Sequence, residues 1–286
     1  MEVRFRLVDV FTESPYAGNQ LCVVPETPAE LDGETMHILA REIGFSETTF
    51  VTASGTDRYR MRIFTPNEEL PFAGHPTLGT AFTLVREGRV SSPAVQTTEL
   101  GDVPVEVDVG AGFAWMRQFA PEFRAEFQDR ELLARAVGLP EEDLHSDLPA
   151  QVVFTGLAPL LVPVRDQDAL RRAERDGRAC EEAAARAGAE CLYLFAVRGD
   201  GGVMARMFDP FFGIGEDPAT GSAAGPLGAY LAARSLAGLP GRIVIAQGEM
   251  VGRPSFLHVD VRPEADSWVV RVGGGVRAVG EGVFRL

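Results

Sequence analysis

Apolar and polar residues alternate along much of the chain, and this period of two predicts many short strands. In the first half we expect strands at 3–11, around Val23, at 45–52, at 58–65 and, as a pair, within 103–118. A longer period replaces the alternation in two places and predicts helices there. These helices are expected at 28–43, ending at Gly44, and from His75 to Gly88.

The second half returns to the same pattern after a polar stretch at 121–150, which is expected to cross between the halves and to hold a short helix at 131–137. Further strands are predicted near 151–164, at 191–197 and at 203–208. Further helices are predicted across 168–187 and around Leu227 and Tyr230, ending by Gly238. The C-terminal stretch is expected to form β-hairpins, with a turn at Gly273-Gly274-Gly275.

Two segments of the chain resemble each other. One runs from Arg62 to Gly79 through Arg-Ile-Phe-Thr-Pro and Ala-Gly-His-Pro, and the other from Arg206 to Gly225 through Arg-Met-Phe-Asp-Pro and Ala-Thr-Gly-Ser. Their arginines lie close to half the chain length apart, which predicts two related half-domains with a ligand cleft where they face each other. Strands outnumber helices, and each half has one apolar helix. The expected fold class is therefore α+β, with two pseudo-symmetric half-domains, each a curved, mostly antiparallel sheet wrapped around a central helix.

The chain carries a formal net charge of −14, which limits its partners. Nucleic acids and anionic membrane surfaces require clustered Lys and Arg, so we expect neither as a partner. No apolar stretch is long enough to span a bilayer, and the N-terminus does not have the pattern of a signal peptide. Three cysteines without metal-ligand spacing favour a reducing, cytoplasmic location.

The motifs of common cofactor sites are missing from the sequence. No Gly-x-Gly-x-x-Gly follows a predicted strand, and there is no Walker loop. The four histidines do not have the spacing of metal ligands. We therefore expect no cofactor and no metal.

Two glycines, Gly74 and Gly221, stand where the predicted apolar helices begin. A glycine lets the backbone approach a ligand closely, and a helix start presents free N–H groups with partial positive charge. A carboxylate would be held well at such a place despite the negative net charge. The alternative is structural, because Gly is a common turn residue and Asp217-Pro218 can begin a helix as N-cap and first residue.

Four polar residues near these loops are candidates for chemistry. Glu47 shares one face of a predicted strand with Phe45 and Thr49, and burial there would suit a general acid/base. The alternative for Glu47 is a solvent-exposed face, which the residues by themselves favour. His75 could donate a hydrogen bond to a substrate or pack structurally, while Asp217 and Ser222 could bind a ligand or start a helix.

These residues lie in motifs that carry a family resemblance over nearly the whole chain. The sequence resembles the PhzF-like phenazine-biosynthesis isomerases, which share the fold of diaminopimelate epimerase. The matching motifs are Asp9-Val10-Phe11 with Gly18-Asn19, Phe45 to Val51, Arg62 to Pro66, Leu70 to Pro76, Arg206 to Phe208, Glu216 to Pro226, Gln247-Gly248 and Gly252 to Ser255.

The resemblance implies a role for each candidate. Glu47 corresponds to the catalytic acid/base of the family, and His75 and Asp217 are implied to bind substrate and manage protons. The substrate-binding residues that it implies are Gly74, Gly221, Ser222 and Asn19. For Glu47 this outweighs the interpretation as a surface residue.

The resemblance also bears on mechanism and assembly. Epimerases of this fold place a Cys before the Gly of each loop, and the corresponding residues here are Ala73 and Thr220, so a two-thiol mechanism is not expected. The expected half-domains are 1–118, joined by the strand 278–286, and 119–277. Family members are commonly homodimers, which implies a homodimer here.

The function that the resemblance implies is isomerisation of trans-2,3-dihydro-3-hydroxyanthranilate without a cofactor. Glu47 would take a proton from C3 and return one to C1. Two alternatives remain open at this stage. One is another cofactor-free isomerase or epimerase of an amino or hydroxy acid. The other is a protein that binds a small acid without catalysis.

Overall fold

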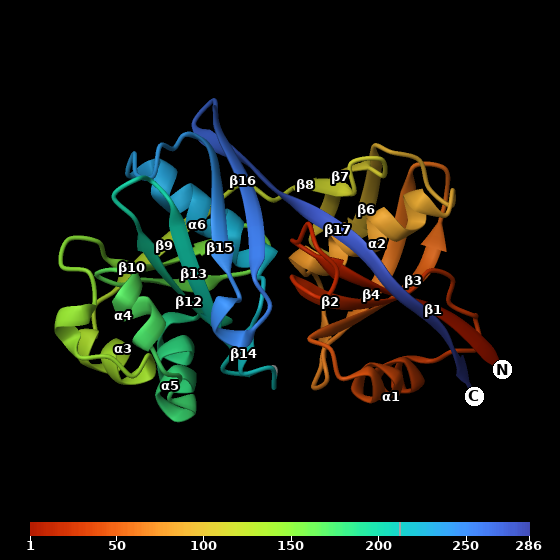
Figure 1. The fold of residues 1–286 in the computed structure, drawn as a ribbon, viewed down its shortest axis with the longest axis horizontal. Coiled ribbons are helices and arrows are strands. Elements are labelled where there is room, and N and C mark those ends of the chain that lie inside the picture. The colour runs from red at the N-terminus through yellow and green to blue at the C-terminus, as the bar shows by residue number, and fades with distance from the viewer. Residues whose placement is uncertain (212) are drawn as a thin grey trace. The chain divides into compact units, whose positions relative to one another are not determined.

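The structure, a computed structural model, describes residues 1–211 and 213–286. The chain folds into two compact units. The first unit contains Met1–Arg117 and Val272–Leu286, and the second contains Gln118–Arg271 (Figure 1). The first unit is therefore completed by the C-terminal end of the chain.

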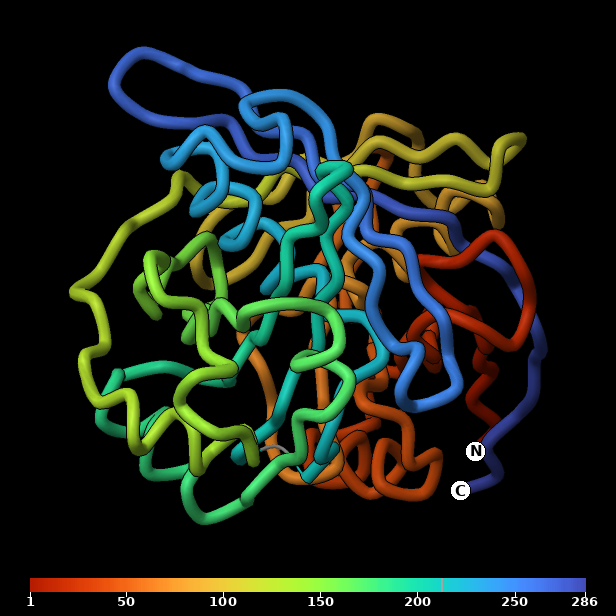
Figure 2. Tube along the Cα trace, turned by 60° about the vertical axis from the view of Figure 1, so that its left-hand side comes forward, coloured from red at the N-terminus to blue at the C-terminus, as the bar shows by residue number. Residues whose placement is uncertain are grey.

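The first unit is a sheet with two helices. Its strands are β1 (Glu2–Val10), β2 (Asn19–Val24), β3 (Glu47–Ser54), β4 (Arg58–Phe64), β5 (Glu69–Leu70), β6 (Ala94–Thr98), β7 (Gly101–Asp108), β8 (Phe113–Arg117) and most of β17 (Ser267–Arg285). Its helices are α1 (Gly33–Ile43) and α2 (Gly74–Arg86). Both chain ends lie side by side in Figure 2, because β1 pairs antiparallel with the end of β17 and Leu286 N donates to Met1 O over 2.9 Å.

The second unit has a similar sheet and more helices. Its strands are β9 (Glu122–Phe127), β10 (Ala150–Phe154), β11 (Pro159–Pro163), β12 (Cys191–Val197), β13 (Val203–Phe208), β14 (Glu216–Asp217), β15 (Gly241–Gln247) and β16 (Ser255–Glu264). Its helices are α3 (Arg130–Ala136), α4 (Gln167–Arg172), α5 (Gly177–Ala187) and α6 (Gly221–Ala233), with short 3₁₀ turns at Glu141–Asp143 and Glu249–Val251.

The two units pair their strands in the same order. In the first unit β2 runs parallel to β3, β4 runs parallel to β6, and the pairs β1–β2, β3–β4, β4–β5 and β6–β7 are antiparallel. In the second, β11–β12 and β13–β15 are parallel, and β10–β11, β12–β13, β13–β14 and β15–β16 are antiparallel. The repeat that the sequence indicates is thus a repeat of topology.

Side chains follow the repeat as well. Arg62 donates to both carboxylate oxygens of Glu69 over 2.6 Å, and its Cζ lies 4.9 Å from the ring centroid of Phe64. Arg206 is bound in the same way to Glu216, with its Cζ 4.9 Å from the ring centroid of Phe208. In each unit this ion pair joins the strand before the loop to the short strand within it.

Each sheet packs around one helix that is buried along most of its length. Every residue of α2 from Gly74 to Leu84 is buried, as is every residue of α6 from Gly221 to Ala232. A helix apolar on all sides belongs in a core. Small residues allow the close packing, since a Cβ on Gly228 would lie 2.5 Å from Val259 Cγ1.

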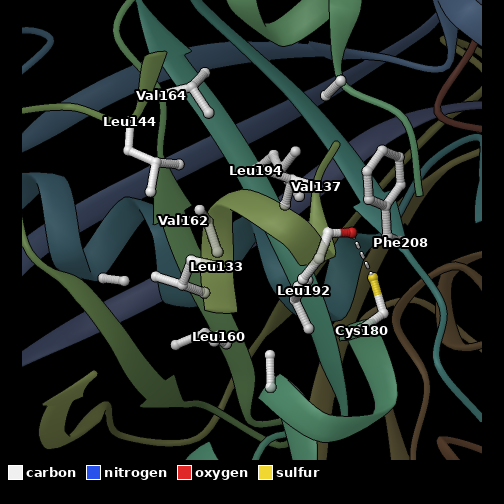
Figure 3. Packing of buried hydrophobic residues seen from close by; sticks show 14 of the residues in the cluster. Leu133, Val137, Leu144, Leu160, Val162, Val164, Cys180, Leu192, Leu194 and Phe208 are labelled. Carbon is white, nitrogen blue, oxygen red and sulfur yellow. Dashed lines mark hydrogen bonds between the residues drawn. The ribbon is translucent and has the colours of Figure 1, made fainter. Parts of the chain in front are cut away.

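A second layer covers the other side of the sheet in the second unit. Helices α3, α4 and α5 lie there and bury an apolar cluster against β11 and β12 (Figure 3). Its labelled members are Leu133, Val137, Leu144, Leu160, Val162, Val164, Cys180, Leu192, Leu194 and Phe208. The Cys180 thiol donates to Ala136 O over 3.1 Å, so this buried sulfur serves packing.

Two helices differ from the sequence prediction in extent. The helix expected at 28–43 begins at Gly33, because the Asp32 carboxylate caps it by accepting from Thr35 N over 2.8 Å. The helix expected at 168–187 is two helices, α4 and α5. Asp176 caps the second by accepting from Ala179 N over 2.9 Å. In both cases an Asp cap marks the start that apolar periodicity missed.

The turn expected at Gly273-Gly274-Gly275 is wrong, because all three residues lie inside the long strand β17. The glycines provide space. A Cβ on Gly273 would lie 2.5 Å from the Trp115 ring, and one on Gly275 would lie 2.2 Å from Thr12 O. These residues let β17 approach neighbouring backbone closely.

We predict that Gly275→Ala destabilises the protein by about 1–3 kcal/mol, because the added methyl group meets backbone that has little room to move. Urea unfolding measures the free energy of unfolding. The control is Gly199→Ala, at an exposed glycine whose Cβ would meet nothing within 4 Å. Equal stability of Gly275→Ala and wild type would contradict the packing argument.

Candidate active site

Glu47 is buried, with 9% of its surface exposed, at the start of β3. Its strand pairs with β2 in parallel, and Leu21 lies opposite Glu47 in the register. The interpretation of Glu47 as a solvent-exposed residue is therefore wrong. The period-two pattern could not decide this, because it does not say which face of a strand is covered.

His75 lies in the first turn of α2 and faces Glu47. Its Nε2 is 3.4 Å from Glu47 Oε2, and its side chain is 3% exposed. Burial lowers the pKa of His75 to about 3, although a hydrogen bond with the Gln20 backbone acts in the opposite direction. The imidazole is therefore neutral near pH 7, and its contact with Glu47 is not an ion pair of two charges.

A chain of hydrogen bonds orients the imidazole. The Ser46 hydroxyl donates to Asn19 Oδ1 over 3.0 Å, and Asn19 Nδ2 lies 3.1 Å from His75 Nδ1. His75 Nε2 is the ring nitrogen nearest Glu47 Oε2. No hydrogen-bond partner of His75 Nε2 occurs among residues 1–211 and 213–286.

The start of α2 differs from those of the outer helices. Each outer helix is capped by an Asp side chain, and these caps are Asp32, Asp129, Asp166 and Asp176. The N-cap of α2 is Ala73, which has no capping side chain, and the segment Ala73–His75 is buried. A buried helix start without a cap leaves N–H groups available for a ligand.

The start of α6 in the second unit has the same property. Its N-cap is Thr220, whose hydroxyl makes no capping bond, and Gly221 and Ser222 follow as buried first residues of the helix. Gln118 supports the turn by donating to Gly221 O over 2.9 Å, and it accepts from the Thr155 hydroxyl over 2.7 Å. The polar groups around the helix start are thus held in place.

Asp217 ends the short strand β14 and is 4% exposed. Its Oδ2 accepts from the Thr220 hydroxyl over 2.5 Å. The interpretation of Asp217 as the N-cap is wrong, because the helix begins further along the chain with Thr220 as its cap. The carboxylate is therefore placed beside the helix start rather than on it.

The structure thus brings the candidate residues together within each unit. In the first unit Asn19, Glu47 and His75 are linked, with Gly74 next to His75 in the chain. In the second unit Asp217 lies beside the start of α6, whose first two residues are Gly221 and Ser222. Sequence reasoning missed the hydroxyl of Ser46 and the amide of Gln118. The one signal in the sequence for the role of Ser46 was its position directly before Glu47.

Within residues 1–211 and 213–286, no group of three or more His, Cys, Asp and Glu side chains is placed to hold a metal ion. None of the helices in the described part of the chain is long and apolar enough to cross a membrane.

We predict that His75 makes stability depend on pH. Its pKa is about 3 in the folded state, whereas an unfolded histidine titrates near about 6.5. Below that value the unfolded state binds a proton that the folded state does not bind. Stability is therefore lost as the pH falls toward about 3, by up to about 1.4 kcal/mol per pH unit.

The measurement is urea unfolding of wild type and His75→Gln between about pH 7 and pH 4.5. The variant lacks the titrating group, so the stability of the wild type should fall more steeply, by about 2–3 kcal/mol over this range. A stability difference between the two proteins that is the same at both pH values would contradict a neutral, buried His75.

Residues 8–282 match the family model described as phenazine biosynthesis-like protein. A trans-2,3-dihydro-3-hydroxyanthranilate isomerase from Pseudomonas aeruginosa is 36% identical over 284 residues, which cover 98% of each chain. The crystal structure of a PhzF-family phenazine biosynthesis protein from Bacillus anthracis superposes with a TM-score of 0.88 at 27% identity and covers 100% of both chains.

The fold is also shared more widely. A probable proline racemase from Agrobacterium radiobacter superposes with a TM-score of 0.70 at 12% identity. The superposition covers 99% of this chain and 93% of the racemase chain. At this identity the similarity shows a shared fold and nothing more. The α+β fold class expected from the sequence is confirmed. The family model and the alignment with the named isomerase both cover nearly the full length of this chain. The chain therefore belongs to the PhzC-PhzF family of phenazine biosynthesis-like proteins and is an isomerase of that family.

Proposed function

We propose that this isomerase moves a proton between carbons of a small carboxylate-bearing substrate, without a cofactor and with Glu47 as its single acid/base. The observation that carries the proposal is the buried pair of Glu47 and neutral His75 beside an uncapped helix start. A carboxyl group shielded from water can hold a proton during transfer and prevent its loss to solvent.

The two side chains of this pair suit different tasks. Glu47 supplies the carboxyl group of a carbon acid/base, while neutral His75 offers an N–H that can donate to a substrate oxygen. The residues before the two helix-starting glycines are Ala73 and Thr220, and neither side chain can act as a base at neutral pH. This supports one acid/base rather than two.

The helix starts supply the binding groups. We propose Gly74 in the first unit, and Gly221 and Ser222 in the second, as residues whose backbone N–H groups can bind a carboxylate. Asp217 would bind a group that donates hydrogen bonds, such as an amine, and Asn19 would act beside His75. Support comes from the burial of both helix starts and from the lack of a side-chain cap at either.

Similarity to the named relative supports a specific substrate. We propose trans-2,3-dihydro-3-hydroxyanthranilate, which carries both a carboxylate and an amine. Glu47 would take the proton from C3, the ring electrons would shift, and the protonated carboxyl group would return a proton to C1. The resulting enol becomes a ketone. A role in phenazine biosynthesis, a cytoplasmic location and a homodimer in solution belong to the same proposal.

A second candidate uses the same residues on another substrate. The helix starts and Asp217 fit any small acid that carries an amino or hydroxyl group, so an isomerase or epimerase of a different amino or hydroxy acid is compatible with the same contacts. Reactions in deuterated water separate the two, because only true substrates acquire solvent deuterium at carbon when Glu47 is present.

We predict that Glu47→Gln lowers kcat by about 100-fold or more, because the amide cannot carry the transferred proton. Turnover of trans-2,3-dihydro-3-hydroxyanthranilate measures this. The matched control is Glu42→Gln, which makes the same chemical change at an exposed residue of α1 and should leave kcat unchanged.

Four outcomes are informative. Loss of activity in Glu47→Gln with an intact fold supports the proposal. An active Glu47→Gln protein excludes Glu47 as the acid/base. If wild type does not convert this compound but introduces deuterium into another amino or hydroxy acid, the second candidate replaces the first. Binding of small acids without any exchange would indicate a protein that binds but does not catalyse.

A further inference from the structure

Thr220 occupies the N-cap of α6 without capping the helix. Threonine hydroxyls at this position ordinarily accept a hydrogen bond from a backbone N–H of the first turn. Here the hydroxyl donates to Asp217 Oδ2 over 2.5 Å instead. The first N–H groups of α6 are therefore left without a bond to this side chain.

Gln247 enforces this arrangement from the end of β15. Its Nε2 donates to Thr220 Oγ1 over 3.0 Å and to the backbone oxygen of Asp217 over 2.8 Å. Because the Thr220 oxygen accepts from Gln247, its own proton is directed toward the Asp217 carboxylate. One amide group thus fixes both the loop backbone and the direction of the hydroxyl.

Tyr193, in β12, fixes the orientation of the amide itself. Its hydroxyl donates to Gln247 Oε1 over 2.9 Å, and the same oxygen accepts from Thr220 N over 3.2 Å. Burial raises the pKa of Tyr193 well above its usual value, with a smaller contribution from Asp217, so the phenol keeps its proton. Two donors at Oε1 leave Nε2 of Gln247 as the donor to Thr220.

We propose that Tyr193, Gln247 and Thr220 form a positioning chain that holds the Asp217 carboxylate as a charged, oriented acceptor and keeps the start of α6 open for the carboxylate of the substrate. This deepens the proposed function and rests on the contact between Asp217 and substrate proposed there. All four side chains are buried, with exposed fractions of 0% for Tyr193, 3% for Gln247, 4% for Asp217 and 6% for Thr220.

The positioning chain has a consequence for substrate specificity. A hydroxyl that donates to a carboxylate favours its ionised form. An ionised Asp217 selects a substrate group that donates hydrogen bonds or carries positive charge, while the adjacent N–H groups select an anion. Together they select a substrate whose amine lies close to its carboxylate. Tyr193, Gln247 and Thr220 act through Asp217 and are positioning residues.

The test removes the hydroxyl without changing the shape of the side chain. Thr220→Val should lower kcat/KM by about 10- to 100-fold, mainly through a higher KM, because a hydrogen bond to a charged group is lost. The acid limb of the pH profile of kcat/KM should move to higher pH in this variant, because the Asp217 carboxylate protonates more easily without the hydrogen bond. Thr220→Ser, which keeps the hydroxyl, should restore both quantities.

Two further variants separate positioning from packing. Thr83→Val removes a buried hydroxyl that donates to Gly79 O within α2, over 2.8 Å, and should leave kcat/KM unchanged. Tyr193→Phe removes the hydroxyl that is furthest from Asp217 in the positioning chain and should lower kcat/KM by about 2- to 10-fold. This smaller change keeps the test available if Thr220→Val does not fold.

Equal impairment of Thr220→Val and Thr220→Ser, or an acid limb that does not move in Thr220→Val, would overturn the proposal. If wild type does not convert trans-2,3-dihydro-3-hydroxyanthranilate, the proposed function fails. The positioning chain of Tyr193, Gln247 and Thr220 is then tested without substrate. The ¹³C signal of the Asp217 carboxyl carbon should titrate at higher pH in Thr220→Val than in wild type and Thr220→Ser. An unchanged titration would contradict the positioning chain.

Discussion

The starts of α2 and α6 are buried without a side-chain cap, and the other features of the site follow from this constraint. A buried backbone N–H without a partner is costly, so a helix start without a side-chain cap needs another acceptor. Outer helices of the same chain are capped by Asp side chains. The proposed function assigns both helix starts to a ligand group with negative charge.

Amide side chains hold the site groups in position. Asn19 orients His75, Gln118 binds the backbone of Gly221, and Gln247 joins Thr220 to the loop that carries Asp217. Amides do not titrate, so these contacts stay the same over a wide pH range. Glu47, His75 and Asp217 are the titratable residues with proposed chemical roles.

Much of the fold could be predicted from the sequence. The strands expected at 191–197 and 203–208 agree with β12 and β13, since buried strands have a clear apolar pattern. The triglycine in β17 could not be interpreted locally, because Trp115 and Thr12, which require its small size, lie far away in the sequence. Glu47 was recognised through its motif, whereas its burial depends on α2. Gln118 was missed because it lies 103 residues before Gly221.

The proposed binding of a carboxylate at the uncapped helix starts can be tested by amide NMR of ¹⁵N-labelled protein. The probes are 2-aminobenzoate and 2-aminobenzamide, which differ in the charge of one group. Downfield proton shifts of the backbone amides of Gly74, Gly221 and Ser222 are expected with 2-aminobenzoate and not with 2-aminobenzamide. Equal shifts with both probes, or shifts confined to other residues, would exclude carboxylate binding at the helix starts.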